Sequence, residues 1–222
     1  GYKIILIYFS ISNSMPGNGS SKLKSVFHEI HHIPIDKIDF FFIFLTAVVY
    51  RLLFKLPLQT TWLNSQRIIY KFSRKISYIE KKYKKTFYHF YSIRSKALWS
   101  IAEKNKKPFV IDLVDSMTLN LERKCSITKN LKKIFWIYEL NAIRIFEQNL
   151  PFFHCCKKYL VVSKIDKDNL KINSPKRKDF ISVNNIGYKI PSNLDKLKYD
   201  QGANKKIIFF GSLSYEPNLN AL

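Results

Sequence analysis

Short, uninterrupted apolar runs recur along this chain, and polar segments containing serine, asparagine or glycine follow several of them. Runs of this length that are rich in β-branched and aromatic residues are typical of strands buried on both faces of a parallel sheet. The pattern predicts strands at residues 3–9, 40–45, 87–90, 109–114, 159–162, 180–183 and 206–213.

The segments between these runs favour helices. Ser20 or Ser21 is a suitable N-cap for a helix that ends near His32. Further helices are predicted directly after residue 45, within residues 62–86, and at residues 95–105, 131–150 and 164–172. The segment 131–150 carries apolar residues at helical spacing, namely Ile134, Ile137, Tyr138, Ala142, Ile145 and Phe146. This order predicts an α/β fold with a parallel, doubly wound sheet.

A polar segment near the end of the chain predicts a domain boundary. Residues 191–205 contain proline, asparagine and glycine and are typical of a linker. The strand-then-glycine pattern restarts after it, at residues 206–213. We therefore expect an amino-terminal Rossmann-like domain at 1–190, a linker at 191–205, and the start of a second, truncated domain at 206–222. The chain is expected to be a fragment of a longer protein.

Charge and composition narrow the function classes. The chain has 222 residues, with 38 Lys and Arg against 16 Asp and Glu, a formal net charge of +22. A hydrophobic share of 46% excludes a disordered chain despite this charge. The basic excess suits nucleic acid or the anionic face of a membrane. Three cysteines, two of them adjacent, argue against a disulfide framework and favour a reducing compartment.

Residues 38–56 are the most apolar part of the chain. The run is too short to span a bilayer, which takes about 20 apolar residues. It is either an ordinary core segment or a helix that presents Tyr50, Leu53 and Phe54, with Arg51 and Lys55, to a membrane surface. The first apolar run is of strand length and no small-residue cleavage site follows it, so we expect no signal peptide.

Candidate site residues follow the predicted strands, because ligands of open parallel sheets bind at the carboxyl ends of the strands. Glycines there let backbone N–H groups approach a phosphate. Carboxylates there serve either as general bases on a hydroxyl or as helix caps. The rule selects Gly17, Asn18, Gly19, Asp112, Asp115, Ser116, Ser163, Asn184, Asn185, Gly187, Gly211 and Ser212.

The histidines offer two further candidates. His89, near a strand end, suits acid–base work, and we expect His89 and Asp115 to be the catalytic residues. His28 and His32 are four residues apart, which is metal-ligand spacing on a helix, but no HExxH motif is present. We expect no metal site.

The order of several motifs resembles the amino-terminal part of family 4 glycosyltransferases of the two-domain GT-B type, and among them bacterial sugar transferases associated with exopolysaccharide export. The carrying segments are MPGNGSSKLK at 15–24, KLPLQT at 55–60, DLVDS at 112–116, the helix containing residues 138–147, YLVVSKID at 159–166, NNIG at 184–187 and IFFGSLSYEPNLNA at 208–221. The last is the most specific, because it is similar to the start of the family's second domain.

The resemblance implies transfer of a sugar from a nucleotide diphosphate donor to an acceptor hydroxyl, with retention at the anomeric carbon. It implies that Gly17, Asn18, Gly19, Gly211 and Ser212 bind the donor diphosphate without a metal or cofactor. The remaining cleft residues implied are Asp112, Ser116, Ser163, Asn185 and Gly187.

Three features depart from the family pattern. Residues 21–40 are few for a full first helix and a second strand. Residues 214–217 replace the arginine and Lys-Gly pair that many members carry after Gly-x-Leu, and the family's Glu-x7-Glu element lies beyond Leu222. The fragment alone is therefore expected to be inactive.

The expected partners are a nucleotide sugar and a glycan or lipid-linked acceptor. We also expect a cytoplasmic protein with peripheral contact at the inner face of the plasma membrane, and no nucleic acid. The alternatives are a non-catalytic basic Rossmann-like module that binds anionic membrane or nucleic acid, and a degenerate remnant of the transferase.

Overall fold

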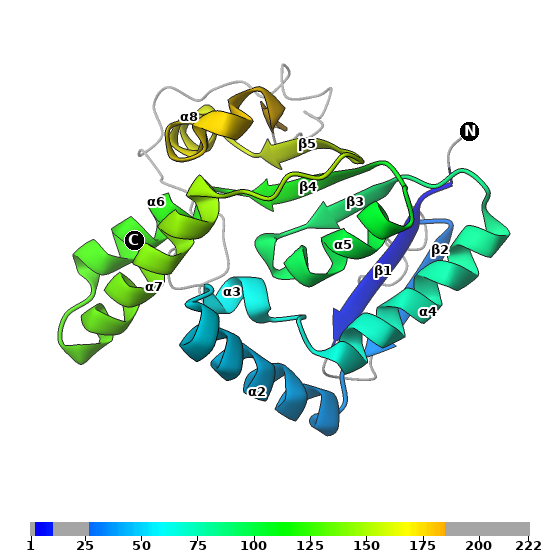
Figure 1. The fold of residues 1–222 in the computed structure, drawn as a ribbon, viewed down its shortest axis with the longest axis horizontal. Coiled ribbons are helices and arrows are strands. Elements are labelled where there is room, and N and C mark those ends of the chain that lie inside the picture. Colours follow the sequence, from blue (N-terminus) through cyan, green and yellow to red (C-terminus); the bar gives the residue numbers. More distant parts are fainter. Residues whose placement is uncertain (1–2, 11–26, 185–222) are drawn as a thin grey trace, which may run out of the picture. The chain divides into compact units, whose positions relative to one another are not determined.

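A computed structural model describes residues 3–10 and 27–184 of the chain (Figure 1). These residues all belong to one compact unit, Gly1–Ile186, and residues 187–222 form a second unit. The predicted linker and second domain, together with Gly17, Asn18, Gly19, Asn185, Gly187, Gly211 and Ser212, lie outside the described residues.

Strands and helices alternate through the described residues. The strands are β1 (Ile5–Ser10), β2 (Glu29–Pro34), β3 (Tyr88–Tyr91), β4 (Phe109–Val114), β5 (Cys156–Val161) and β6 (Ile181–Val183). The α-helices are α2 (Lys37–Phe54), α3 (Leu58–Thr61), α4 (Gln66–Lys82), α5 (Lys96–Lys104), α6 (Met117–Ile127), α7 (Leu131–Gln148) and α8 (Lys164–Asn173), with short 3₁₀ helices at Ile93–Ser95 and Pro175–Phe180.

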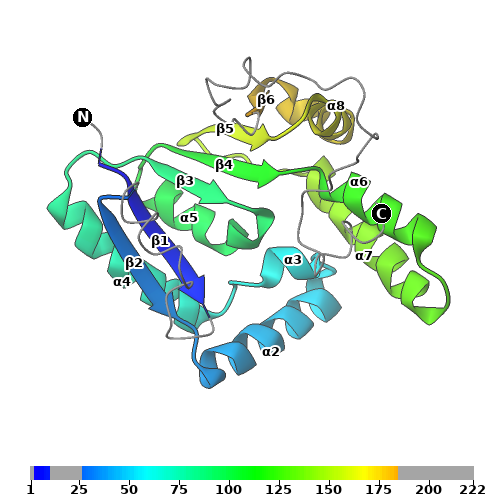
Figure 2. The same cartoon turned by 180° about the vertical axis from the view of Figure 1, so that it is seen from behind.

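All strand pairs in this part of the chain are parallel. β1 pairs with β2 from Ile5 opposite Glu29 to Ser10 opposite Pro34. The other four strands form a second sheet in the order β3-β4-β5-β6, which Figure 2 shows from behind. The connections run through α5, through α6 and α7, and through α8. The fold is therefore α/β with parallel sheets, compatible with a Rossmann-like domain.

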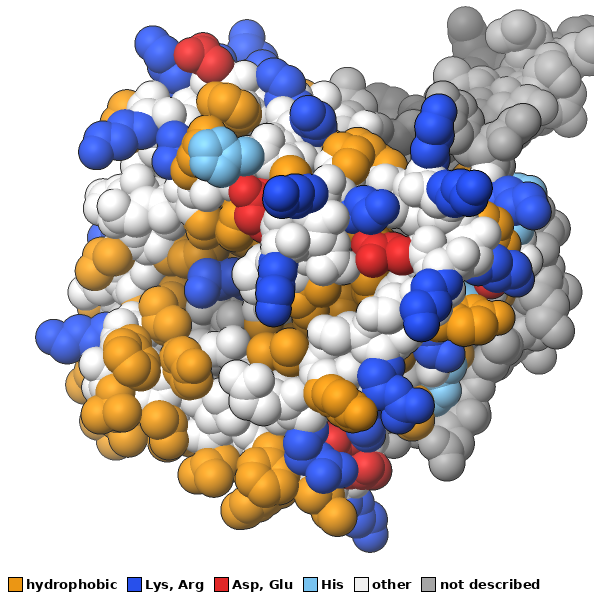
Figure 3. Space-filling view, turned by 45° about the vertical axis from the view of Figure 1, so that its right-hand side comes forward, with side chains coloured by type: hydrophobic (Ala, Val, Ile, Leu, Met, Phe, Trp, Pro, Cys, Tyr) orange, Lys and Arg blue, Asp and Glu red, His pale blue; other side chains and the backbone are white. Residues whose placement is uncertain are grey.

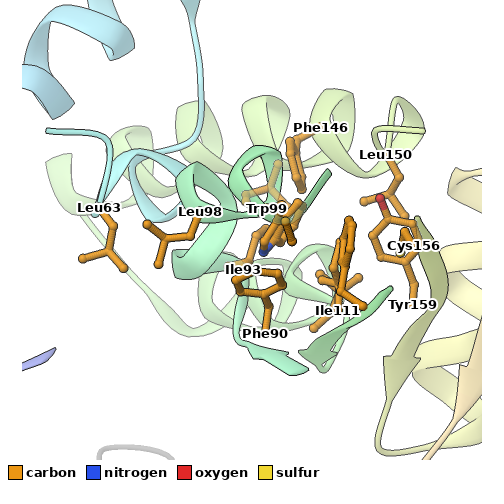
Figure 4. Packing of buried hydrophobic residues seen from close by; sticks show 14 of the residues in the cluster. Leu63, Phe90, Ile93, Leu98, Trp99, Ile111, Phe146, Leu150, Cys156 and Tyr159 are labelled. Carbon is orange, nitrogen blue, oxygen red and sulfur yellow. The ribbon is translucent and has the colours of Figure 1, made fainter. Parts of the chain in front are cut away.

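The hydrophobic core is one cluster that extends from the β3–β6 sheet and its connecting helices to residues of β2, α2 and α4. Trp99 of α5 is fully buried, as are Phe109 and Ile111 of β4. The Phe109 ring meets the Phe90 ring edge to face at a centroid distance of 5.6 Å. Trp99 Nε1 donates to Ser95 Oγ at 2.9 Å, so its polar atom is satisfied inside the core. Figure 4 shows these side chains interdigitating with those of α7 and β5.

Most of the predicted elements after residue 60 are confirmed. The strand at 109–114 has the predicted bounds, and β3, β5 and β6 overlap their predicted ranges. Helices α4, α5, α7 and α8 also coincide with predicted helices. The sequence analysis missed β2, α3 and α6.

The predicted strand at residues 40–45 is wrong, because these residues belong to α2. A capping box opens this helix: Asp39 N donates to Asp36 Oδ1 at 2.7 Å, and Asp36 N donates to Asp39 Oδ2 at 3.1 Å. Lys55, in the left-handed conformation with φ 52°, ends it. A continuous apolar run is compatible with either a buried strand or a helix. Here the capping residues at both ends favour the helix.

The predicted helix ending near His32 is also wrong over its described part. Residues 29–34 form β2, which pairs with β1 along six residues. His32 Nε2 lies 2.9 Å from Ser10 Oγ, and its ring stacks on Tyr8 at 4.9 Å. His28 and His32 therefore do not share a helix face, and the helical metal-ligand spacing considered for them does not exist.

Candidate active site

Polar residues follow the carboxyl ends of three neighbouring strands of the β3–β6 sheet. Three backbone hydrogen bonds extend the sheet at this edge: Ser92 N donates to Asp112 O, Val162 N to Val114 O, and Asn184 N to Val161 O, each at 2.7 Å. Because the strands are parallel, the turns that follow them lie at one edge, where the sequence analysis placed the site.

His89 and Asp112 form the first group, which lies on the strands themselves: His89 is the second residue of β3, opposite Val110, rather than at a strand end. Asp112 pairs in register with Tyr91, so His89 and Asp112 lie on one face of the two strands. His89 Nε2 lies 3.3 Å from Asp112 Oδ2. The His89 side chain is 50% exposed, whereas that of Asp112 is 9% exposed. A buried carboxylate thus orients an imidazole that solvent and ligands can reach.

The backbone is strained two residues after Asp112, where an amide N–H donates to the Asp112 carboxylate. Val114 has φ 72°, in the left-handed region that β-branched residues avoid. Val114 N donates to Asp112 Oδ1 at 2.9 Å, so the second carboxylate oxygen is also occupied. Strain of about 1–3 kcal/mol at such a residue is common at functional sites.

Asp115 lies at the start of the next turn. Its carboxylate accepts a hydrogen bond from the side-chain amide of Asn120. Burial, and to a lesser extent the negative charge of Asp166, raise the pKa of Asp115 above its ordinary value, despite the Asn120 contact. A carboxyl group whose pKa is raised in this way is a candidate proton-exchanging group.

Ser116 is fully buried and belongs to a hydrogen-bond network rather than to an open surface. Its hydroxyl lies 2.9 Å from Asn169 Oδ1 and 3.2 Å from Glu147 Oε2. Glu147 Oε1 also accepts from Met117 N at 2.8 Å and Thr118 N at 3.3 Å. Glu147 of α7 thus caps the amino terminus of α6, a role that the sequence analysis considered for Asp115 or Ser116.

Ser163 caps α8, and Asp166 joins that cap to the Asp115–Ser116 turn. Ser163 Oγ accepts from Asp166 N at 3.1 Å. Asp166 Oδ1 accepts from Ser116 N at 2.9 Å. Through Asp166, Ser163 links the turn after β5 to the turn after β4. The Ser163 hydroxyl is itself hydrogen-bonded to the Asp166 carboxylate. Asn184 follows β6 at the same edge.

The structure thus joins the sequence-selected residues into two groups. His89 and Asp112 form one, and Asp115, Ser116 and Ser163 belong to the other through shared neighbours. Among the described residues, no hydrogen bond or ion pair links His89 to Asp115. The described ranges 3–10 and 27–184 contain no cluster of three or more His, Cys, Asp or Glu side chains suited to a metal ion.

Comparison with known proteins adds nothing to this geometry. No family model, curated protein or solved structure matches the chain. The function must therefore be argued from the site itself.

Glu147 and Asp166 are residues of the candidate site that the sequence analysis did not select. Glu147 was assigned only to a long helix, and its neighbours Ile143 and Phe146 are buried core residues. A carboxylate on the apolar face of a helix is the signal that could have identified it, because such a group needs donors when buried. Burial raises the pKa of Glu147, and the surrounding donors oppose that shift.

Proposed function

We propose that this chain is the acceptor-side part of a retaining sugar transferase of the GT-B type. The complete transferase moves a sugar from a nucleotide diphosphate donor to an acceptor hydroxyl in cell-surface glycan synthesis. The observation that carries the proposal is the half-exposed His89 of β3, held by the buried Asp112 on the neighbouring strand of a parallel sheet. The order of the motifs between residues 15 and 221 supports the same reaction.

His89 supplies the acid–base group for the acceptor. With Nε2–H donated to Asp112, the free lone pair of His89 is on Nδ1. The acceptor oxygen bonds to the anomeric carbon on the face from which the diphosphate leaves, so the configuration is retained. The proton of the acceptor hydroxyl passes to Nδ1, and Asp112 stabilises the imidazolium that forms. The bond between the anomeric carbon and the phosphate oxygen breaks, and its electron pair leaves with the nucleotide diphosphate.

Asp115 is the second proton-exchanging group of the proposal, because its pKa is raised. The proposed diphosphate contacts are backbone N–H groups at Gly17, Gly19 and Gly211, with Asn18 and Ser212 beside them. Donors of this kind stabilise the charge that develops on the leaving group. The proposed donor lobe begins at residues 206–222, and no cofactor is required.

Nucleotide release by the full-length gene product tests the proposal. The protein is incubated with a panel of nucleotide sugars and a lipid-linked acceptor. We expect release of one nucleotide diphosphate, and a loss of about 10²–10⁴-fold in kcat for His89→Gln, the range for removal of a general base. His154→Gln, a matched change at an exposed histidine, leaves kcat unchanged.

Two results would overturn this function. One is the absence of turnover with every donor together with no binding of UDP or GDP. The other is wild-type kcat in His89→Gln. Absence of turnover combined with tight, steeply salt-dependent binding of duplex DNA would instead favour the basic binding module.

A further inference from the structure

Helix α2 contacts the rest of the protein through one narrow stripe. Its buried residues are Asp39, Ile43, Ala47 and Arg51, spaced four apart along the helix. This spacing covers a single face, because residues four apart lie one above the other. The remaining circumference is not polar, as it would be in an ordinary surface helix.

Ten large hydrophobic side chains of α2 are exposed. They are Ile38, Phe40, Phe41, Phe42, Phe44, Leu45, Val49, Leu52, Leu53 and Phe54. Leu52 and Leu53 are the most open, each 71% exposed. Since a fully exposed aromatic side chain presents about 150–250 Å², this surface amounts to roughly 1,000 Å². Figure 3 shows hydrophobic side chains gathered along the lower edge of the molecule, where α2 lies in Figure 1.

The charged side chains within α2 do not lie on this exposed surface. Asp39 is fully buried and accepts from Arg67 Nε at 3.0 Å and from Lys71. Arg51 is buried against Glu139, with 3.4 Å between Arg51 Nη2 and Glu139 Oε2. The exposed face therefore has no charge along the helix until Lys37 at one end and Lys55 just after the other.

We propose that the exposed face of α2 docks on an anionic lipid surface, lying in the plane of the interface. An apolar patch of this size exceeds the few hundred Å² usual on monomers and marks an interaction site. None of the helices in the described ranges is both long and apolar enough to cross a bilayer, so a position along the interface fits better than a span.

The charge of the chain and the apolar face of α2 together favour an anionic lipid surface over a second copy of the chain or a nucleic acid. Lysines at both ends of the helix, and a net charge of +22 on the chain, complement anionic headgroups. The same charge opposes association with a second copy of the chain. Nucleic acid would attract the lysines but leave the apolar face uncovered.

Trp62 provides a natural reporter at the edge of this surface. It follows α3, is 40% exposed, and meets the Phe40 ring edge to face at a centroid distance of 6.3 Å. An aromatic ring with one polar atom is favoured at the headgroup level. When α2 docks, the Trp62 indole is therefore expected to enter the interface.

Co-sedimentation with vesicles tests the proposal on the whole chain. Vesicles of equal parts phosphatidylcholine and phosphatidylglycerol should bind the protein, and vesicles of phosphatidylcholine alone should bind it more weakly. The double variant Leu52→Gln, Leu53→Gln should lower affinity at least about tenfold, because two exposed leucines no longer enter the apolar layer. The matched control Ile165→Gln, Ile172→Gln, on α8, should bind like wild type.

Brominated phosphatidylcholine in the anionic vesicles gives a readout that does not depend on the leucine variants. Tryptophan fluorescence of the wild-type chain should be quenched, and Trp62→Phe should remove most of that quenching. The fully buried Trp99 serves as an internal reference.

Either of two results overturns the proposal: no binding to the anionic vesicles, or equal binding by wild type and the leucine variant. A lipid-independent dimer that the leucine variant dissociates would also overturn it, since a second copy would then cover α2. The assay needs no nucleotide sugar, so its outcome is separate from that of the transferase test.

Discussion

Glu147 of α7, which caps the amino terminus of α6, is expected to contribute more to stability than any surface charge on these two helices. Its side chain is buried, and its carboxylate serves three donors, namely the hydroxyl of Ser116 and the amides of Met117 and Thr118. Glu147→Ala leaves the amides of Met117 and Thr118 without their acceptor, while the Ser116 hydroxyl keeps Asn169 Oδ1 at 2.9 Å. Each buried donor left unsatisfied costs about 1–3 kcal/mol. Relief of the buried carboxylate and entry of water offset part of that cost, so we expect a loss of about 3 kcal/mol.

Glu147→Gln separates hydrogen bonding from charge. The amide oxygen can keep the bonds to the α6 backbone, and no charge is then buried. Because burial raises the pKa of Glu147, the folded state takes up a proton more readily than the unfolded state. The contribution of this group to stability is therefore largest below pH 4.5 and falls as pH rises through the folded-state pKa. The glutamine variant should lose that pH dependence and remain within about 1 kcal/mol of wild type at neutral pH.

Urea unfolding of both variants measures these effects. Glu122→Ala is the matched control on α6, since Glu122 forms a half-exposed ion pair with Arg144 at 2.7 Å. Such pairs contribute about 0–1 kcal/mol. A Glu147→Ala variant as stable as Glu122→Ala would refute the capping role. A large loss in Glu147→Gln with no change in Glu147→Ala would refute the reasoning on burial.

Two further predictions concern other ion pairs. Hydrogen bonding to Lys82, above all, lowers the pKa of Glu29 from 4.5 to about 2, so its stabilising contribution is present above pH 4.5 and is lost as pH falls toward 2. Glu29→Gln should therefore flatten the unfolding free energy over that range in a pH series of urea titrations. Arg51→Ala leaves Glu139 buried without its cation and should cost about 3–5 kcal/mol in urea unfolding. Adding Glu139→Gln should recover part of that loss, because the acceptor for Leu58 N remains while the buried charge disappears.

Local pattern was sufficient for the central strands. β4 could be predicted with its bounds because Phe109, Ile111 and Leu113 are buried together on a strand covered on both faces. β2 could not, since its sequence EIHHIP has no strand-like alternation. Pairing with β1, and contacts of its histidines with Ser10 and Tyr8, stabilise it, and these contacts are non-local.

The sequence located the edge of the sheet but not the roles of its residues. The rule on strand ends selected Asp112, Ser116 and Ser163, and the structure places all three at one edge. What each does depends on partners elsewhere in the chain: Glu147 is 31 residues from Ser116, and Asp166 is 50 residues from it. Spacing within a motif carries no information on such contacts.

The buried charges of α2 and α7 explain why these helices expose apolar side chains. On α7 the structure buries Glu139 and Glu147, while Ile134 and Ile145, which share the predicted apolar spacing, are exposed. Glu139 accepts from the first turn of α3, and Glu147 accepts from the first turn of α6. The inner face of α7 thus holds the amino termini of α3 and α6, where carboxylates are stabilised.

A helix that buries charged residues on its inner face has fewer apolar residues in contact with the core. In α2 the stripe contains one aspartate and one arginine among four buried positions, so the remaining apolar residues have no place inside the domain. Water is an unfavourable environment for them. The pairing of Arg51 with Glu139, which also accepts from the first turn of α3, takes up part of the inner face of α2. The apolar outer surface of α2 stays in water, and burial of that surface against another phase would add stability that the isolated domain lacks.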